Sequence, residues 1–254
     1  MPRKSRTAAL LLAGFFLLCG HPARAEKFFT KQSGPDTYTV CQVDPRQDVL
    51  RLFWKGTDGK PCKTFDRVVE TARSEGLILS FASNAGMYEP DFSPVGLFMD
   101  QGQVLHPLNL RPGEGNFYLM PNGVFAIADG LARVVDSRAF PQLKNVRLAT
   151  QSGPLLVSGG RIHPQFRPGS TSKLYRNGVG VNSAGQALFV ISETPINLHT
   201  FARFFRDELG CPNALFFDGT VSSLYAPSLQ RNDRRIDLGP IIGVVSPVAQ
   251  KATQ

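Results

Sequence analysis

Short apolar runs separated by turn-forming residues dominate this chain, a pattern typical of many β-strands. The expected strands are residues 37–43, 49–54, 77–81, 116–120, 123–128, 131–135, 154–157, 161–163, 187–191 and 214–217. Pro121-Asn122-Gly123, Asp129-Gly130 and Ser158-Gly159-Gly160 fall between consecutive runs and suit tight hairpins. The pattern therefore predicts sheets that are largely antiparallel.

Two segments have the spacing of an amphipathic helix instead. Their apolar stripes are Phe65, Val68, Val69 and Ala72, and Phe201, Phe204, Phe205 and Leu209. A glycine closes each segment, Gly76 in the first and Gly210 in the second. We therefore expect an α+β fold with mixed, largely antiparallel sheets and a few flanking helices.

Each expected helix leads into an apolar strand that ends at a polar residue. Asn84 and Asp218 both lie eight positions after the closing glycine. Ligand sites often form at such strand ends in sheets that carry helices. Chance similarity of two helix–strand units is the alternative, because such connections are short in general.

The N-terminus has the organisation of a cleavable signal peptide. Three basic residues in the first six precede the apolar run 8–19, and Ala23-Arg24-Ala25 provides small residues at a cleavage site. A membrane span needs about 20 apolar residues, so we expect no stable anchor. Lipid attachment at Cys19 is disfavoured by the bulky Leu18 before it. Cleavage near Ala25 predicts a periplasmic or secreted protein.

The mature chain, residues 26–254, is expected to form a single domain with a loose tail at 247–254. Removing residues 1–25 removes four basic residues and no acidic one, which lowers the formal charge from +8 to +4. The remaining basic residues are scattered, and nucleic-acid binding needs a concentrated basic surface. Nucleic acid is therefore disfavoured as a partner, and the oligomeric state is not indicated.

Three cysteines remain after cleavage. Export to an oxidising compartment favours a disulfide, and Cys41 and Cys62 are the candidates because they flank two neighbouring strands. Sequence alone does not fix the pairing. Cys211 is expected to be a buried thiol beside a helix end.

Familiar catalytic motifs are missing, including the Walker loop, the dinucleotide glycine fingerprint, HExxH and GxSxG. Five segments instead combine polar residues with turn glycines: 84–88, 121–125, 151–154, 176–180 and 218–222. Each can be an ordinary turn. In this order, however, they resemble the phosphodiester glycosidase family over residues 79–245, and in particular its small exported bacterial branch.

The resemblance implies a fold with a deep pocket and a hydrolase that separates a sugar from a phosphodiester. Arg176 then offers a permanently charged fork for phosphate oxygens. Asp218 and, second, Glu193 are the candidate catalytic carboxylates for an oxocarbenium-like transition state. The ordinary alternatives are a structural, ion-paired Arg176, a turn residue at Asp218 and a loop residue at Glu193.

The same segments supply candidate substrate-binding groups through side-chain amides and turn backbone N–H groups. These candidates are Asn84, Asn122, Gln151, Ser152, Asn177 and Gly219.

We thus expect an envelope glycosidase that hydrolyses a sugar-1-phosphodiester, with an N-acetylhexosamine-type sugar. A glycan- or phosphopolymer-binding protein without activity and a metal-dependent phosphodiesterase are the alternatives. No cofactor is required, and a divalent cation is compatible with phosphate binding although no metal-site spacing indicates one. The sugar, the aglycone and the pathway are not determined.

Overall fold

The computed structural model describes residues 27–248, so the predicted signal peptide at 1–25 and most of the predicted tail lie outside the described residues. Within this range the chain forms three antiparallel sheets with few helices. The fold is therefore mainly β, and the antiparallel pairing expected from the hairpin pattern is confirmed.

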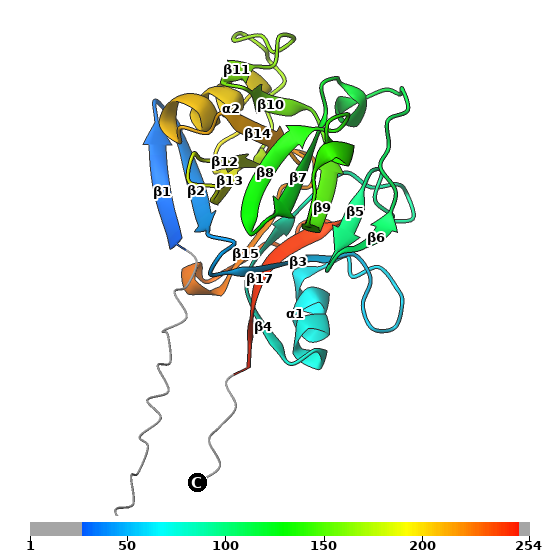
Figure 1. Ribbon diagram of the computed structural model, residues 1–254. Helices are drawn as coiled ribbons and strands as arrows, with labels where there is room; N and C mark the ends of the chain where they lie inside the picture. Colours follow the sequence, from blue (N-terminus) through cyan, green and yellow to red (C-terminus); the bar gives the residue numbers. More distant parts are fainter. Residues whose placement is uncertain (1–26, 249–254) are drawn as a thin grey trace, which may run out of the picture.

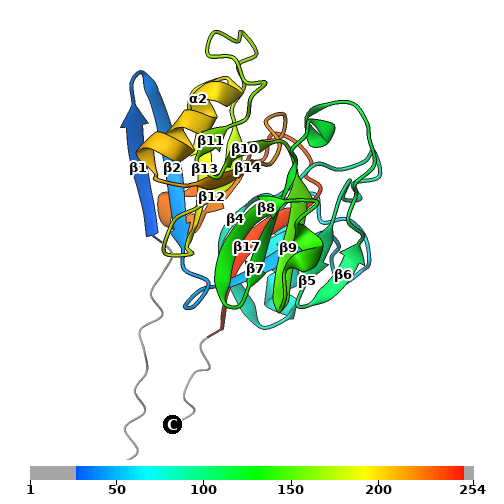
Figure 2. The same ribbon diagram turned by 45° about the horizontal axis from the view of Figure 1, so that its top comes forward.

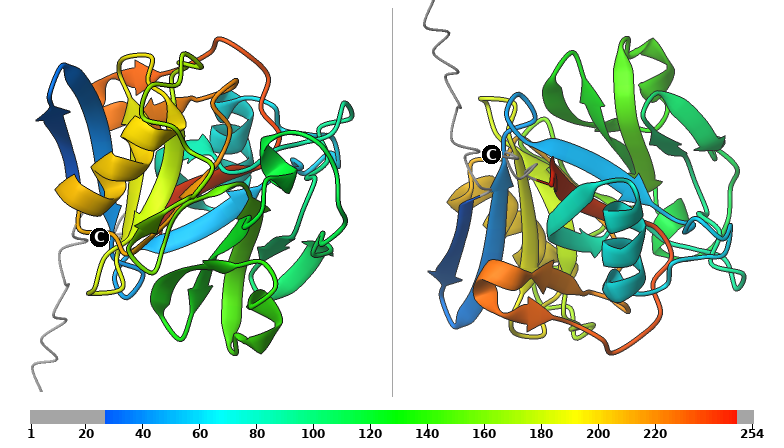
Figure 3. Two further views of the ribbon diagram at one scale, coloured as in Figure 1. Left: turned by 90° about the horizontal axis from the view of Figure 1, so that it is seen from above. Right: turned by 90° about the horizontal axis from the view of Figure 1, so that it is seen from below.

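The first sheet has seven strands. In spatial order they are β1 (Lys27–Ser33), β2 (Asp36–Val43), β13 (Ala187–Ser192), β12 (Asn177–Val181), β14 (Asn213–Phe216), β10 (Leu155–Ser158) and β11 (Arg161–Ile162). Its outer face is covered by α2 (Leu198–Arg203) and the π-helical turn η3 (Phe204–Glu208), which lie over these strands when the molecule is seen from above (Figure 3, left).

The second and third sheets have five strands each. The second runs β16 (Arg231–Asn232), β15 (Leu224–Ala226), β4 (Leu77–Asn84), β17 (Ile241–Pro247) and β3 (Val49–Phe53). The third runs β6 (Gln103–His106), β5 (Phe98–Asp100), β9 (Val146–Ser152), β7 (Gly123–Ala128) and β8 (Leu131–Asp136). Helix α1 (Phe65–Ser74) packs on the second sheet, at the opposite end of the molecule from α2 (Figure 1). Short 3₁₀ turns are η1 (Asn116–Tyr118), η2 (Phe140–Gln142) and η4 (Pro227–Leu229).

The three sheets share one apolar core at the point where they meet (Figure 2). Phe189 of the first sheet lies at this junction. Its ring centroid is 5.1 Å from that of Phe81 in the second sheet and 5.5 Å from that of Phe125 in the third. Aromatic contacts at these distances add to the hydrophobic stabilisation that burial itself provides. The junction fixes the sheets relative to one another, and with them the strand ends that form the site.

Both predicted helices are present. Thr64 caps α1 by accepting a hydrogen bond from Arg67 N, and the helix ends before Gly76, which has a φ of +73°. The second helix changes to π geometry at Phe204. The extra residue in this turn, marked by Leu209 N donating to Phe204 O, lets Phe204 and Phe205 both remain buried.

Two local predictions are wrong. Residues 116–120 are not a strand, because Tyr118 N donates to Gly115 O and Leu119 N to Asn116 O to close the turn η1. The predicted tail does not begin at residue 247, because Pro247 pairs with Leu77 at the end of β17. Val248 N also donates to Gly76 O.

The expected Cys41–Cys62 disulfide is not formed. Cys41 packs in the central core between the sheets, whereas Cys62 belongs to the separate apolar cluster beneath α1. The Cys62 Sγ lies 3.9 Å from Thr71 Oγ1. Cys211 is buried just beyond Gly210, as expected, and its burial raises the pKa of the thiol to about 12.

Candidate functional site

Two buried asparagines join the first and second sheets. Asn84 ends β4 and Asn177 begins β12, and both are almost fully buried. Asn177 Nδ2 donates to Asn84 Oδ1 at 2.8 Å, and Asn84 Nδ2 donates to Asn177 Oδ1 at 3.2 Å. Asn177 Nδ2 also donates to Ser83 Oγ at 3.0 Å. Because buried amides are costly to leave unpaired, this reciprocal pair fixes the two strand ends together.

The asparagine pair holds the backbone of Asp218, two residues beyond the end of β14. Asn84 Nδ2 donates to Asp218 O at 3.3 Å, and Asp218 N donates to Asn177 Oδ1 at 3.4 Å. Ser222 Oγ donates to the same Asp218 carbonyl at 3.1 Å. The predicted residues Asn84, Asn177 and Asp218 thus form one cluster, although they come from three separate strands.

The Asp218 carboxylate is partly buried. Burial raises the pKa of Asp218 above its ordinary value, while hydrogen bonds from Thr220 and the positive charge of Arg176 act in the opposite direction. The amide of Thr220 donates to Asp218 Oδ1 at 2.9 Å. The arrangement combines desolvation with a nearby cation, which is the environment expected around a catalytic carboxylate.

Arg176 is 2% exposed. Its Nε donates to Ile196 O at 3.2 Å, and its Nη2 donates to Ser172 O at 3.1 Å. The guanidinium also lies over the ring of Phe216, 5.3 Å from its centroid. Among residues 27–248 no carboxylate comes within 4.0 Å of this guanidinium. Burial lowers the pKa of Arg176, and the charge of Asp218 opposes this effect only in part.

Gly219 makes the approach of Arg176 to this turn possible. A Cβ atom at position 219 would lie 2.9 Å from Arg176 Nη1 and 3.1 Å from Arg176 Cδ. It would also lie 3.2 Å from Phe216 Cζ. A side chain here would therefore push the guanidinium away from Asp218, which gives the Asp-Gly sequence a packing reason beyond the formation of a turn.

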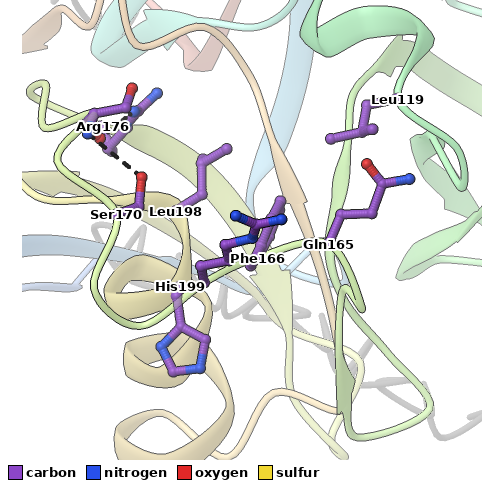
Figure 4. A pocket seen from close by; sticks show the side chains of 9 residues that line it. Leu119, Gln165, Phe166, Ser170, Arg176, Leu198 and His199 are labelled. Carbon is purple, nitrogen blue, oxygen red and sulfur yellow. Dashed lines mark hydrogen bonds between the residues drawn. The ribbon is translucent and has the colours of Figure 1, made fainter.

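Arg176 reaches the wall of a cavity of about 200 Å³ (Figure 4). Arg176 and Ser170 lie on one side of this cavity in Figure 4, and Leu119 and Gln165 lie on the other. Leu198 and His199 contribute from the start of α2. A buried cation without an ion pair that lines a cavity is suited to bind an anionic ligand.

Glu193 stands apart from this cluster. It forms an ion pair with Arg231, and its Oε1 accepts from Thr39 Oγ1 at 2.7 Å. Arg231 also pairs with Asp233 at 3.0 Å. In the described part of the chain, no hydrogen bond or ion pair joins Glu193 to Asp218 or Arg176. The contacts indicate that Glu193 fastens β13 to the segment around β16.

Two other predicted binding residues use their side chains for internal support. Gln151 Oε1 accepts from Leu97 N and Asn109 N, while its Nε2 donates to Asn109 O. Asn122 donates to Phe117 O and accepts from Ser137 Oγ. Both residues are 2% exposed. Their amides therefore have internal partners that hold the surrounding loops, and the expectation that they bind substrate stays a prediction.

Ser152 supports the site from behind. Its Oγ donates to Phe217 O at 2.8 Å, and the side chain is fully buried. Phe217 is the residue directly before Asp218. Ser152 thus links β9 of the third sheet to the end of β14, and its direct contact with substrate stays a prediction.

Sequence reasoning missed several groups around the cluster. Ser222 and Thr220 lie within the selected segment 218–222, but their roles depend on how the turn folds. Ser83 directly precedes the selected Asn84, and Tyr88 ends the selected segment 84–88. Burial raises the pKa of Tyr88, and the negative charges of Asp218 and Asp237 raise it further, while the phenol donates to Asp237 O at 2.7 Å. The feature of the sequence that could have pointed to these four residues is their closeness to a selected residue.

Within residues 27–248, no group of three His, Cys, Asp or Glu side chains is arranged to hold a metal ion. The described helices include none with the length and apolar character needed to cross a bilayer.

Residues 79–242 match the family model of the phosphodiester glycosidases, which covers more than half of the chain. The chain belongs to the phosphodiester glycosidase family. This membership confirms the resemblance carried by the five polar segments, which the match contains.

One related sequence and one solved structure are similar to this chain. The chain is 35% identical over 189 residues to the uncharacterized protein YigE of Escherichia coli K12, covering 74% of each chain. The structure resembles the catalytic domain of zebrafish N-acetylglucosamine-1-phosphodiester α-N-acetylglucosaminidase auto-inhibited by its pro-peptide. That likeness has a TM-score of 0.61 at 14% identity, over 92% of this chain and 85% of that one.

A hypothetical protein from Synechocystis has a similar structure, with a TM-score of 0.55 and 16% identity over 87% of this chain and 61% of that one. At these low sequence identities, the two structural similarities show a shared fold.

Proposed function

We propose that this phosphodiester glycosidase family member hydrolyses a sugar-1-phosphodiester. The observation that carries the proposal is a buried Arg176 that has no ion-paired carboxylate among residues 27–248, faces a cavity and lies beside a partly buried Asp218. A buried guanidinium needs a counter-charge, and a phosphodiester brings one. The family membership supports the same bond as the target.

Arg176 holds the phosphodiester in this mechanism. Its Nε and Nη2 are committed to the carbonyls of Ile196 and Ser172, and these hydrogen bonds fix the plane of the guanidinium. Its Nη1 has no hydrogen-bond partner among the described residues and is the donor for a phosphate oxygen. As the bond to the sugar breaks, the leaving phosphate gains charge, and a fixed donor stabilises that charge without reorganisation.

Asp218 acts on the sugar side. The bond between C1 and the phosphate oxygen breaks, and its electron pair leaves with the phosphate monoester. Water supplies the hydroxyl group at C1 and releases one proton. The Asp218 carboxylate stabilises the positive charge that develops at C1, either as base toward this water or as nucleophile. A phosphate monoester is a good leaving group, so this reaction does not require a second carboxylate as acid, in agreement with the ion-paired state of Glu193.

An N-acetylhexosamine is the sugar we propose, because the substrate named for the zebrafish enzyme of similar fold carries N-acetylglucosamine. The cell envelope is the proposed location, which rests on the signal-peptide pattern of residues 1–25.

The test is hydrolysis of N-acetylglucosamine 1-phosphate propyl ester in water labelled with ¹⁸O, followed by mass spectrometry. Cleavage at C1 places the label in the free sugar and gives unlabelled propyl phosphate. Asp218→Asn and Arg176→Gln are each expected to lower kcat/KM by about 100-fold or more. Asp129→Asn is the matched control, because Asp129 lies in an exposed turn at a φ of 51° that asparagine also adopts.

Label in the phosphate, with sugar 1-phosphate as product and loss of turnover on chelation, would instead identify a metal-dependent phosphodiesterase. Binding of the ester without turnover would identify a binding protein. Full activity in folded Asp218→Asn and Arg176→Gln variants, checked by circular dichroism and thermal unfolding, would contradict the assignment of these residues.

A further inference from the structure

The cavity beside Arg176 has an uneven distribution of charge. Its lining includes the guanidinium groups of Arg167 and Arg176, the imidazole of His199 and no acidic residue. The proposed reaction uses Arg176 alone, so two basic side chains of the same cavity have no assigned role. Such a one-sided lining favours a ligand with more than one negative charge.

Arg176 has limited capacity for a larger anion. Two of its three guanidinium nitrogens already donate to protein carbonyls, as described above. Arg167, in contrast, is exposed, and within residues 27–248 its side chain has no ion pair or hydrogen bond to another protein group. Its guanidinium therefore has its full set of donors available for a ligand.

His199 contributes from the first turn of α2 in a positive environment. Burial lowers its pKa first, then the charges of Arg203 and Arg206, whereas Asp207 acts in the opposite direction. Asp207 is itself ion-paired with Arg203 at 3.2 Å and with Arg206 at 2.6 Å. The Asp207 carboxylate is thus already shared by two arginines.

The loop that carries Arg167 is tied to α2. The N-cap residue Asn197 uses its Nδ2 to donate to Pro168 O at 3.0 Å and to Ser170 O at 3.1 Å. Phe166 stacks on His163, with 4.8 Å between ring centroids. The loop backbone is therefore held in place around Arg167, which lowers the entropic cost of binding a ligand there.

We propose that Arg167 and His199 form a subsite for a second anionic group, carried by the aglycone of the substrate. The inference rests on the proposed function and specifies its substrate class: a glycosyl phosphodiester whose leaving group bears a further phosphate or similar anion. Arg176 binds the phosphate that is cleaved from the sugar. Arg167 provides the positive charge for the distal group, the His199 imidazole donates a hydrogen bond to it, and Phe166 and Leu198 contact the linker between the two anionic groups.

Binding is tested first, with probes that are not cleaved. Isothermal titration calorimetry compares propane-1,3-diyl bisphosphate with propyl phosphate. The unaltered protein is expected to bind the bisphosphate roughly tenfold more tightly, and Arg167→Gln or His199→Gln is expected to remove most of this difference. Arg73→Gln is the matched control, because it removes one exposed positive charge on α1, at the far end of the molecule (Figure 1).

Equal affinity for the two probes, or an equal loss in Arg167→Gln and Arg73→Gln, would overturn the subsite. The second result would mean that net charge alone governs binding.

Turnover then separates the subsite from the proposed function. The substrates are N-acetylglucosamine 1-phosphate esters of propanol and of 3-phosphopropanol. A higher kcat/KM for the second ester that disappears in Arg167→Gln, with unchanged kcat/KM for the first, supports the subsite. Turnover of both esters at equal rates, unaffected by Arg167→Gln, overturns the subsite and leaves the hydrolase intact. Absence of turnover with Arg167-dependent binding of the bisphosphate contradicts the hydrolase and supports the subsite.

Discussion

At the scale of single residues, the site depends on how one carboxylate and one guanidinium share a partly desolvated space. Asp218 is stabilised in its charged form by Arg176 but disfavoured by burial, and burial has the larger effect. Among residues 27–248, Arg176 in turn forms no direct ion pair. The two groups are coupled without neutralising each other, so both keep charge for a substrate.

This coupling predicts a pH dependence. The reaction needs the Asp218 carboxylate, so kcat/KM should fall on acidification with a midpoint above the ordinary Asp pKa of 3.8. Arg176 lowers the pKa of Asp218, and its removal in Arg176→Gln should therefore move this midpoint to higher pH as well as reducing the rate. Profiles of kcat/KM from about pH 3 to about pH 8 measure the shift. An identical midpoint in both proteins would show that a different group controls the acid limb.

At the scale of elements, the site is assembled from strand ends of all three sheets. β4 provides Asn84, β12 provides Asn177, and β14 leads to Asp218. β9 of the third sheet contributes indirectly, through the hydrogen bond from Ser152 to Phe217 O. Each strand end is fixed by a buried polar contact to another strand, so the geometry of Asp218 depends on the pairing of elements rather than on its own turn.

Removing the contact between β9 and β14 should therefore affect both stability and rate. Ser152→Ala leaves the buried Phe217 carbonyl without this partner and should lower the free energy of unfolding by about 1–3 kcal/mol. It should also lower kcat, because Asp218 directly follows Phe217. Urea unfolding and steady-state kinetics measure the two effects, with the exposed Ser158→Ala in β10 as control. A loss of stability with unchanged kcat would limit Ser152 to a structural role.

At the scale of the whole molecule, the arrangement of sheets is held by a shared core and by one buried ionic link. Asp100 of β5 accepts hydrogen bonds from Arg51 Nε at 2.6 Å and from Leu52 N at 3.0 Å, both in β3. Its side chain is 6% exposed. This contact joins β3, the edge strand of the second sheet, to β5 of the third.

Breaking this link should be costly for the whole fold. Asp100→Ala leaves the Arg51 guanidinium, which is largely buried, without its best partner and should lower the free energy of unfolding by about 3 kcal/mol or more. Glu75→Ala removes the exposed partner of the same arginine and should cost less than about 1 kcal/mol. Chemical denaturation of both variants tests the difference. Equal costs would mean that the link between sheets carries little of the stability.

The sequence by itself determined the local elements. The amphipathic spacing of 65–72 and 201–209 and the glycines that follow gave both helices, and the turn residues gave the hairpins between β7 and β8 and between β10 and β11. These features depend on residues a few positions apart, whose periodicity and turn preferences are readable without the fold. The strand predicted at 116–120 is wrong because the flanking Gly115 and Pro121 favour a single turn over a strand.

Which polar residues meet depends on the tertiary fold. Asn84 and Asn177 are 93 positions apart, and their contact depends on the order in which strands join three sheets. The same strand order brings Glu193 into an ion pair with Arg231 and gives the Gln151 amide its partner Asn109 O. It also places Cys41 and Cys62 in different apolar clusters. Hydrophobic periodicity fixes which face of a strand is buried but leaves its neighbours unspecified, so the site became visible only once the sheets were assembled.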